Sequence, residues 1–115
     1  DTAWRITAYQ TQDRRLAPVL DGTEVTARFF ADGRLAGKAG CNNYRANYTG
    51  DDHSIHVGPV ATTRMLCPAP PGVMEQERAY IGALAAASTY KVDAGDLTLY
   101  AEDGELIVKC ERTAD

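Results

Sequence analysis

Short segments in which apolar and polar residues alternate recur along the chain, and this pattern constrains its fold more than any other feature. A period of two puts every second side chain on the same face of a β-strand. The apolar positions that alternate in this way are Trp4, Ile6 and Ala8; Val25, Ala27 and Phe29; Tyr44, Ala46 and Tyr48; Ile55 and Val57; Tyr90 and Val92; Leu97 and Leu99; and Leu106, Val108 and Cys110. We therefore predict several half-buried strands, with Tyr9 on the face opposite Trp4 in the first of them.

Turn signals separate these segments. Asp-Gly or Gly-Asp pairs occur at positions 21–22, 32–33, 50–51, 95–96 and 103–104. Glycine supplies the positive φ that tight hairpin turns require. Short strands joined by tight turns predict a meandering, curved antiparallel sheet.

The segment from Val73 to Ala87 departs from this period and predicts one helix. It follows a rigid connector, residues 67–72, whose three prolines each fix φ and remove a hydrogen-bond donor. Apolar residues recur at helical spacing at Met74, Ile81, Leu84 and Ala85. A helix packed on one curved sheet, in a chain of 115 residues, predicts a single α+β domain over residues 1–115.

Glu77 lies on the same side of this helix as the apolar stripe. An ionised carboxylate in that position needs a cation or several hydrogen-bond donors. Arg64 and the backbone amides of the proline-rich connector are the candidates. We interpret Glu77 as a partly buried anchor between helix and sheet; the alternative is a catalytic acid with a shifted pKa.

The charge of the chain argues against a nucleic-acid partner, and its hydropathy argues against a membrane-spanning helix. Lys and Arg number 12 against 16 Asp and Glu, which gives a net charge of −4, and no basic cluster occurs. Nucleic-acid affinity depends on neutralising phosphates, so we expect no nucleic-acid partner. The mean hydropathy is −0.33, and the apolar runs are shorter than the ~18 residues that a membrane helix needs.

The three cysteines, Cys41, Cys67 and Cys110, leave the redox state open. One disulfide with one free thiol and three free thiols are both consistent with the count, and three pairings are possible. No pair forms C-x-x-C, and the spacing is not that of a zinc finger. We expect no metal and no cofactor.

His53 and His56 could serve two kinds of chemistry. With Asp51 and Asp52 they could hold a metal. A metal needs ligands that converge, however, and the pattern fits a solvated turn followed by an outward-facing histidine better. Either histidine could also activate a Cys41 thiolate. No sequence around Cys41 marks a thiol-protease nucleophile, so we do not favour this chemistry.

Two segments resemble a known family. Residues 37–44, GKAGCNNY, resemble the G-x-x-G-C-N-x-Y signature of the META domain family, whose best-known bacterial members are HslJ-like heat-shock lipoproteins. Residues 63–67, TRMLC, resemble its T-R-M-x-C signature. Trp4 matches the opening strand, the spacing of Glu77, Tyr80 and Leu84 matches the helix, and Leu97 with Leu99 matches a late strand.

The resemblance implies an α+β fold in which about seven or eight antiparallel strands form a rolled, barrel-like sheet against a single helix. It also implies an extracytoplasmic location in the bacterial envelope or outside the cell, often on a lipid anchor, here upstream of Asp1. The family has no settled activity, so no catalytic residue carries over. The resemblance also favours a Cys41–Cys67 disulfide. The residues to which we assign scaffold roles are Trp4, Gly37, Gly40, Cys41, Asn42, Tyr44, Thr63, Arg64, Met65, Cys67 and Glu77.

We accordingly expect a non-enzymatic, exported binding or structural module with a role in stress response or drug tolerance. Its partner would be an envelope or secreted protein, and its oligomeric state stays open. One alternative is a thiol-dependent enzyme or redox protein that uses Cys41 with His53 or His56. Another is an inhibitor or adaptor that docks on a protein through a hairpin or a sheet edge.

Overall fold

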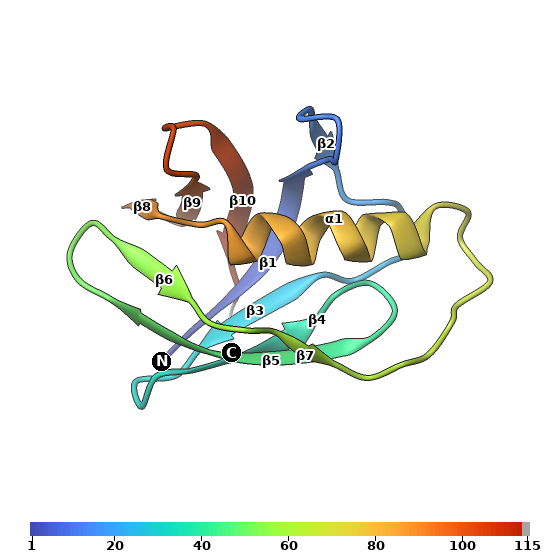
Figure 1. Ribbon diagram of the computed structural model, residues 1–115, viewed down its shortest axis with the longest axis horizontal. Coiled ribbons are helices and arrows are strands. Elements are labelled where there is room, and N and C mark those ends of the chain that lie inside the picture. Colours follow the sequence, from blue (N-terminus) through green and yellow to red (C-terminus); the bar gives the residue numbers. More distant parts are fainter. Residues whose placement is uncertain (114–115) are drawn as a thin grey trace.

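A computed structural model describes residues 1–113, and these residues form one helix and ten strands. The strands are β1 (Thr2–Gln10), β2 (Leu16–Pro18), β3 (Thr26–Phe29), β4 (Arg34–Lys38), β5 (Asn43–Gly50), β6 (Ile55–Val57), β7 (Ala61–Thr62), β8 (Thr89–Asp93), β9 (Asp96–Tyr100) and β10 (Leu106–Arg112), and the helix is α1 (Val73–Ala85). The predicted fold class, a rolled antiparallel sheet with a single helix, is confirmed (Figure 1).

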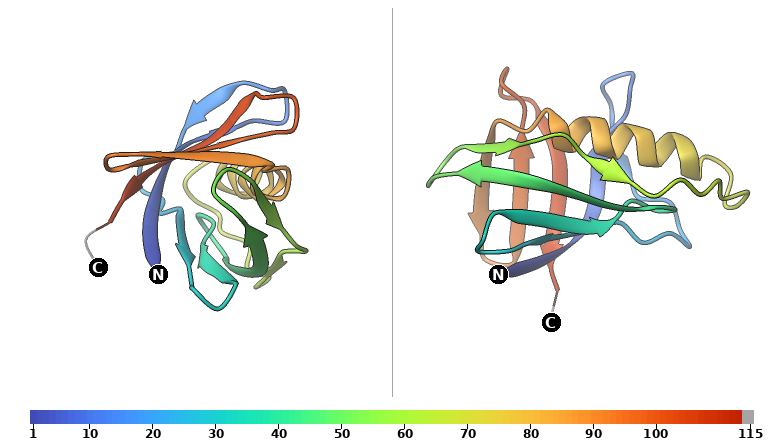
Figure 2. Two further views of the ribbon diagram at one scale, coloured as in Figure 1. Left: turned by 90° about the vertical axis from the view of Figure 1, so that its left-hand side faces the viewer. Right: turned by 60° about the horizontal axis from the view of Figure 1, so that its bottom comes forward.

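The sheet curls until its two outer strands meet. Eight strands follow the order β6-β5-β4-β3-β1-β10-β9-β8, while β2 pairs with β1 and β7 pairs with β5. An isolated bridge between Ser54 and Thr89 joins the two ends of this path. On either side of it, Ile55 N–H donates to the carbonyl of Ser88 and Tyr90 N–H donates to that of His53, both at 3.0 Å. The result is a nearly closed barrel, seen in Figure 2.

A bulge in β1 changes which side chains reach the core. The pairing of β1 with β10 shifts register between Ile6 and Ala8. The extra residue reverses the alternation beyond it, so that Tyr9 is buried with Trp4 and Ile6 while Ala8 is not. The prediction that Tyr9 faces away from Trp4 is therefore wrong.

Helix α1 packs against β1, β10 and β6 and ends at Ala85, two residues before the predicted end. Its buried face carries Val73, Gln76, Glu77, Ala79, Tyr80, Ala83 and Leu84. Met74 and Ile81 are only partly buried, and Ala85 is exposed, so the predicted stripe was rotated away from the true one. No helix of residues 1–113 has the length and apolar character that crossing a membrane requires.

Candidate functional site

Asn42 is the centre of the polar contacts that join the two signature segments. Its side-chain Nδ2 donates to a Glu77 carboxylate oxygen at 2.7 Å and to the Met65 carbonyl at 3.0 Å. Its Oδ1 accepts from the Thr63 hydroxyl at 2.8 Å and from Met65 N–H at 2.7 Å. A side-chain amide has two donor hydrogens and two acceptor lone pairs, so this buried amide is fully used.

Glu77 fastens the helix to the same segment. Its Oε1 accepts from the backbone N–H groups of Cys41, at 3.2 Å, and Asn42, at 2.7 Å. Glu77 is therefore an anchor between helix and sheet, as predicted. Its partners differ from those predicted, because they are neither Arg64 nor the proline-rich connector. The turn between β4 and β5 supplies these amides because its backbone passes directly beside α1.

The Asn42 cluster, defined as Cys41, Asn42, Thr63, Met65 and Glu77, also contains a covalent link. Cys41 forms a disulfide with Cys67 across 26 residues of sequence, in agreement with the pairing that the resemblance favours. The strand β5, the segment after β7 and the helix α1 are thus tied at one point. Cys110 is a buried thiol, and its burial raises the pKa of that thiol to about 12.

The two signature glycines allow this close approach. A Cβ on Gly37 would lie 2.1 Å from the Thr26 carbonyl oxygen of the neighbouring strand β3. Gly40 has a φ of +104°, and a Cβ there would lie 3.0 Å from Nε2 of Gln76. Both positions exclude a side chain for steric reasons, Gly37 through backbone contact and Gly40 also through its left-handed conformation.

Tyr44 extends the cluster into the core. Its hydroxyl donates to the Thr26 carbonyl at 2.7 Å and lies 2.7 Å from the hydroxyl of Tyr80. Since the proton of Tyr44 points to Thr26, Tyr80 is the donor between the two hydroxyls. Burial raises the pKa of both phenols well above their usual range.

Two of the predicted scaffold residues lie outside this arrangement. Arg64 is exposed, and no carboxylate or carbonyl of residues 1–113 holds it, so its predicted anchoring role is wrong. The backbone turns outward after Thr63, where Met65 and Leu66 are 53% and 85% exposed. Trp4 belongs to a different region, the open end of the barrel.

The helix makes a second polar attachment that the sequence analysis missed. Gln76, 1% exposed, accepts from Leu20 N–H at 2.8 Å and donates to the Thr23 hydroxyl at 3.1 Å. Its position next to Glu77, three residues after Val73, is the signal that could have placed it on the buried face. Every buried side-chain nitrogen or oxygen in the described part of the chain has a partner. These contacts hold the fold together.

The histidines lie in the predicted solvated turn and strand. The Asp51 carboxylate accepts from the N–H groups of His53 and Ser54, which lowers the pKa of Asp51 to about 2. His56 is exposed between the buried residues Ile55 and Val57. Within residues 1–113, no group of three or more His, Cys, Asp or Glu side chains could hold a metal ion.

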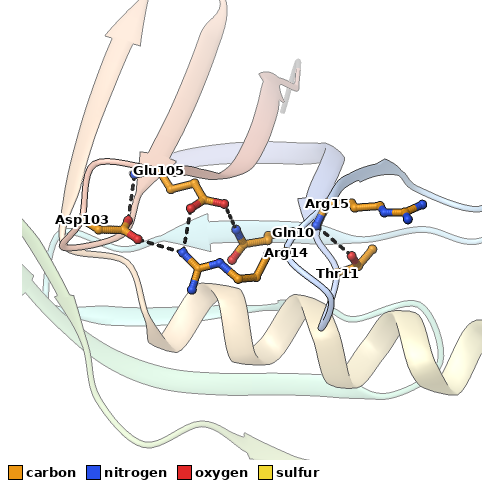
Figure 3. A network of polar contacts seen from close by, with 6 residues as sticks. All are labelled: Gln10, Thr11, Arg14, Arg15, Asp103 and Glu105. Carbon is orange, nitrogen blue, oxygen red and sulfur yellow. Dashed lines mark hydrogen bonds and ion pairs between the residues drawn. The ribbon is translucent and has the colours of Figure 1, made fainter.

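A second polar network fastens two outer turns (Figure 3). Arg14 donates to Asp103 at 2.9 Å and to Glu105 at 2.7 Å, and Gln10 donates to Glu105 at 2.6 Å. The network connects the turn after β1 to the turn between β9 and β10. The Arg14 side chain is 66% exposed, so water screens these ion pairs and they contribute little to stability. All of these groups are engaged with one another.

The open end of the barrel holds an apolar cavity of about 310 Å³, which we call the mouth cavity. Its walls come from seven strands, β1, β3, β5, β6, β8, β9 and β10, and from the β5–β6 turn. The aromatic and aliphatic lining residues are Trp4, Phe29, Tyr48, Ile55, Tyr90, Val92, Leu97 and Leu99, and the polar ones are Thr2, Asp51, Ser54 and Arg112.

The polar atoms of the aromatic residues around the mouth cavity are already bonded within the chain. Trp4 Nε1 donates to the Thr2 hydroxyl at 3.0 Å, and the hydroxyls of Tyr48 and Tyr90 donate to the carbonyls of Phe30 and Asp51 at 2.7 and 2.6 Å. Their rings therefore present apolar surface to the cavity. Apolar pockets in the mouths of β-barrels are common ligand sites, so this cavity is the candidate functional site.

The matches to known proteins extend over nearly the whole chain. The META domain family model matches residues 1–114. A protein from Burkholderia xenovorans, solved by NMR, is similar with a TM-score of 0.78 and 26% identity, over 100% of this chain and 83% of that one. A DUF4847 family protein from Bacteroides vulgatus, solved by crystallography, shares the fold with a TM-score of 0.65 and 16% identity, over 99% of this chain and 94% of that one. No curated protein matches the chain.

Proposed function

This chain belongs to the META domain family, and from that premise we propose that it is a non-enzymatic binding module whose ligand site is the mouth cavity. The observation that carries the proposal is the asymmetry of the barrel. An eight-stranded barrel has an interior just wide enough for side chains or for one small ligand. Here the Asn42 cluster and α1 occupy one end, whereas the other end keeps a cavity of about 310 Å³ with an apolar lining.

The state of Cys41 weighs against the thiol-enzyme alternative. Nucleophilic chemistry at a cysteine needs a thiolate and a nearby base. Cys41 is bonded to Cys67 and lies beside Glu77, while His53 and His56 belong to the β5–β6 turn and to β6. The signature residues act in this proposal as the frame that holds the barrel, and the ligand binds elsewhere.

We further propose that the domain works outside the cytoplasm, in the bacterial envelope, in stress response or drug tolerance. A disulfide is compatible with an oxidising compartment. Thiol counting tests this location directly. Protein from cells lysed directly into denaturant with an alkylating reagent should carry one alkylated thiol, that of Cys110. Three reactive thiols would place the domain in a reducing compartment and contradict the proposal.

The ligand site is tested with a neutral apolar probe, hydrocinnamyl alcohol, added to the uniformly labelled protein during an NMR titration. We expect saturable shifts confined to the lining of the mouth cavity. V92F narrows the entrance from an exposed rim position, since Val92 is 55% exposed, and should weaken binding severalfold. L16F is the matched control, because Leu16 is a 44% exposed apolar residue outside the cavity. Equal affinities for the two variants, or no shifts, would contradict the site.

One observation favours the protein-adaptor alternative as a second candidate. Met65 and Leu66 form an exposed apolar tip that the neighbouring disulfide at Cys67 holds in place. A photo-crosslinking residue at position 66, compared with one at Leu16, tests whether this tip contacts a partner in envelope extracts. Equal crosslinking at both positions would reject this alternative.

A further inference from the structure

Arg112 is the cationic residue among those that line the mouth cavity. It pairs directly with Trp4 across β1 and β10, and directly opposed residues in an antiparallel pair point to the same face. Because Trp4 faces the interior, Arg112 also lies on the inner face, in phase with the buried residues Val108 and Cys110. The alternation of β10 thus ends with a charged side chain at the rim of an apolar cavity.

The guanidinium of Arg112 is available for an additional contact. Its Cζ lies 5.5 Å from the centroid of the Trp4 ring, which places the guanidinium in a cation–π contact with the aromatic wall. Among residues 1–113, no carboxylate forms an ion pair with it. The residue is exposed, so an incoming group can reach it from solvent.

Asp51 is the acidic residue of the same lining, and its charge is directed elsewhere. Its carboxylate accepts two backbone N–H groups of its own turn, those of His53 and Ser54, at 3.0 and 2.9 Å. These donors hold the Asp51 carboxylate against the turn. Arg112 is therefore the charged group of the lining that has no ion-pair partner among residues 1–113.

We propose that the mouth cavity binds a small amphipathic anion, with its apolar body against Trp4, Tyr90 and Leu99 and its carboxylate at Arg112. This inference rests on the proposed function and adds the ligand class. A cavity of about 310 Å³ is at the small end of the range of ligand pockets. It suits one aromatic ring with a short acidic side chain or an alkyl acid of similar size.

Three probes with the same apolar body separate the charge effect from apolar burial. Hydrocinnamate is the anion, hydrocinnamyl alcohol is the neutral analogue and phenylpropylamine is the cation. We expect the anion to bind about five- to tenfold more tightly than the alcohol, and the amine more weakly than the alcohol, by NMR titration in low salt. The preference for the anion should shrink as salt is added, because a partly exposed charge pair is screened.

Two variants test the residue itself. R112Q should remove the preference for the anion over the alcohol, whereas R112K should retain most of that preference because it keeps the charge. Equal binding of anion and alcohol, or an unchanged preference in R112Q, would overturn the ligand class and leave the cavity as a neutral apolar site. Absence of binding by all three probes would overturn the proposed function as well.

Discussion

Asn42 uses its whole hydrogen-bonding capacity at one buried point, and an isosteric change tests what this arrangement contributes. N42D keeps the shape but replaces two donor hydrogens with a charged acceptor that faces the Glu77 carboxylate and the Met65 carbonyl. Breaking a buried polar network by removing one partner costs about 3 kcal/mol or more. We expect N42D to lower the free energy of unfolding by about that amount at neutral pH.

The neighbouring residue supplies the control for this substitution. Asn43 is exposed, and its side chain makes none of the contacts of Asn42, so N43D should change the free energy of unfolding by less than about 0.5 kcal/mol. Urea unfolding followed by circular dichroism measures both variants. Part of the loss in N42D should be recovered in mild acid, where the new carboxyl group becomes protonated. Equal stability of the two variants would show that the amide network is dispensable.

The buried phenols predict a loss of stability in alkali. Burial raises the pKa of Tyr44 and Tyr80 in the folded chain, whereas tyrosines in the unfolded chain ionise near pH ~10. Above that pH the unfolded chain has released protons that the folded chain still holds, so the free energy of unfolding falls as pH rises. Each buried phenol contributes a fall of about 1.4 kcal/mol per pH unit.

Guanidinium unfolding at a series of pH values from about 8 to about 11 measures this fall. Y80F removes one of the two buried phenols and leaves the hydrogen bond from Tyr44 to Thr26 intact. The slope above pH ~10 should therefore decrease by about 1.4 kcal/mol per pH unit in Y80F. A slope that is the same in wild type and Y80F would mean that other groups cause the alkaline loss.

Among the structural elements, the strands with alternating apolar residues could be predicted from the sequence and the other strands could not. Alternation identified β1, β3, β5, β6, β8, β9 and β10 because each has two or more apolar residues at a period of two. β2, β4 and β7 lack that signal: β2 ends in a proline, β7 has two residues, and β4 has Gly37 two positions after Leu35. These segments form strands because neighbouring strands pair with them. A local sequence pattern carries little information about such tertiary pairing.

The signature residues show the same division between local and tertiary information. The sequence placed Glu77 on the buried face of a helix, because that depends on local periodicity. It could not name the amides of Cys41 and Asn42 as partners of Glu77, because these lie 35 or 36 residues away. Arg112 was missed for a related reason: its inward direction follows from its register with Trp4, which is a property of the sheet.

At Gly37 the packing of two strands depends on the absence of a side chain. A Cβ there would meet the backbone of Thr26 at 2.1 Å, and a neighbouring strand cannot yield as a flexible side chain can. We expect G37A to lower the free energy of unfolding by about 3 kcal/mol, in the range of severe packing strain. Thermal and urea unfolding measure this loss.

The matched control for G37A is the same substitution on the helix. A Cβ at Gly82 meets nothing within 4 Å, so G82A should raise stability by about 0.5–1 kcal/mol through helix propensity. G40A should give a smaller loss than G37A, since its nearest neighbour is the side chain of Gln76, and it keeps the comparison measurable if G37A does not fold. A G37A variant as stable as wild type would contradict the close approach of β3 and β4.

For the whole molecule, the two ends of the barrel have different strengths. The end next to α1 is tied by a disulfide, the buried amide of Asn42 and the carboxylate of Glu77. The closing seam between β6 and β8 has one isolated bridge, at Ser54 and Thr89, and borders the mouth cavity. A region with few backbone hydrogen bonds opens at lower free energy than the global unfolding transition. The seam is therefore the place where the barrel should open first.

Native-state hydrogen exchange tests this order of opening. The amides of Ile55 and Tyr90, which donate across the seam, should exchange through a local opening, while those of Ile6 in β1 and Cys110 in β10, two central strands of the sheet, should exchange only near global unfolding. Y90F removes the hydrogen bond from the Tyr90 hydroxyl to the Asp51 carbonyl and should speed exchange at the seam alone. Because Ile55 and Tyr90 also line the mouth cavity, hydrocinnamate should slow their exchange and leave that of Ile6 unchanged. Uniform exchange at all four amides, in wild type and Y90F, would mean that the barrel opens only as a whole.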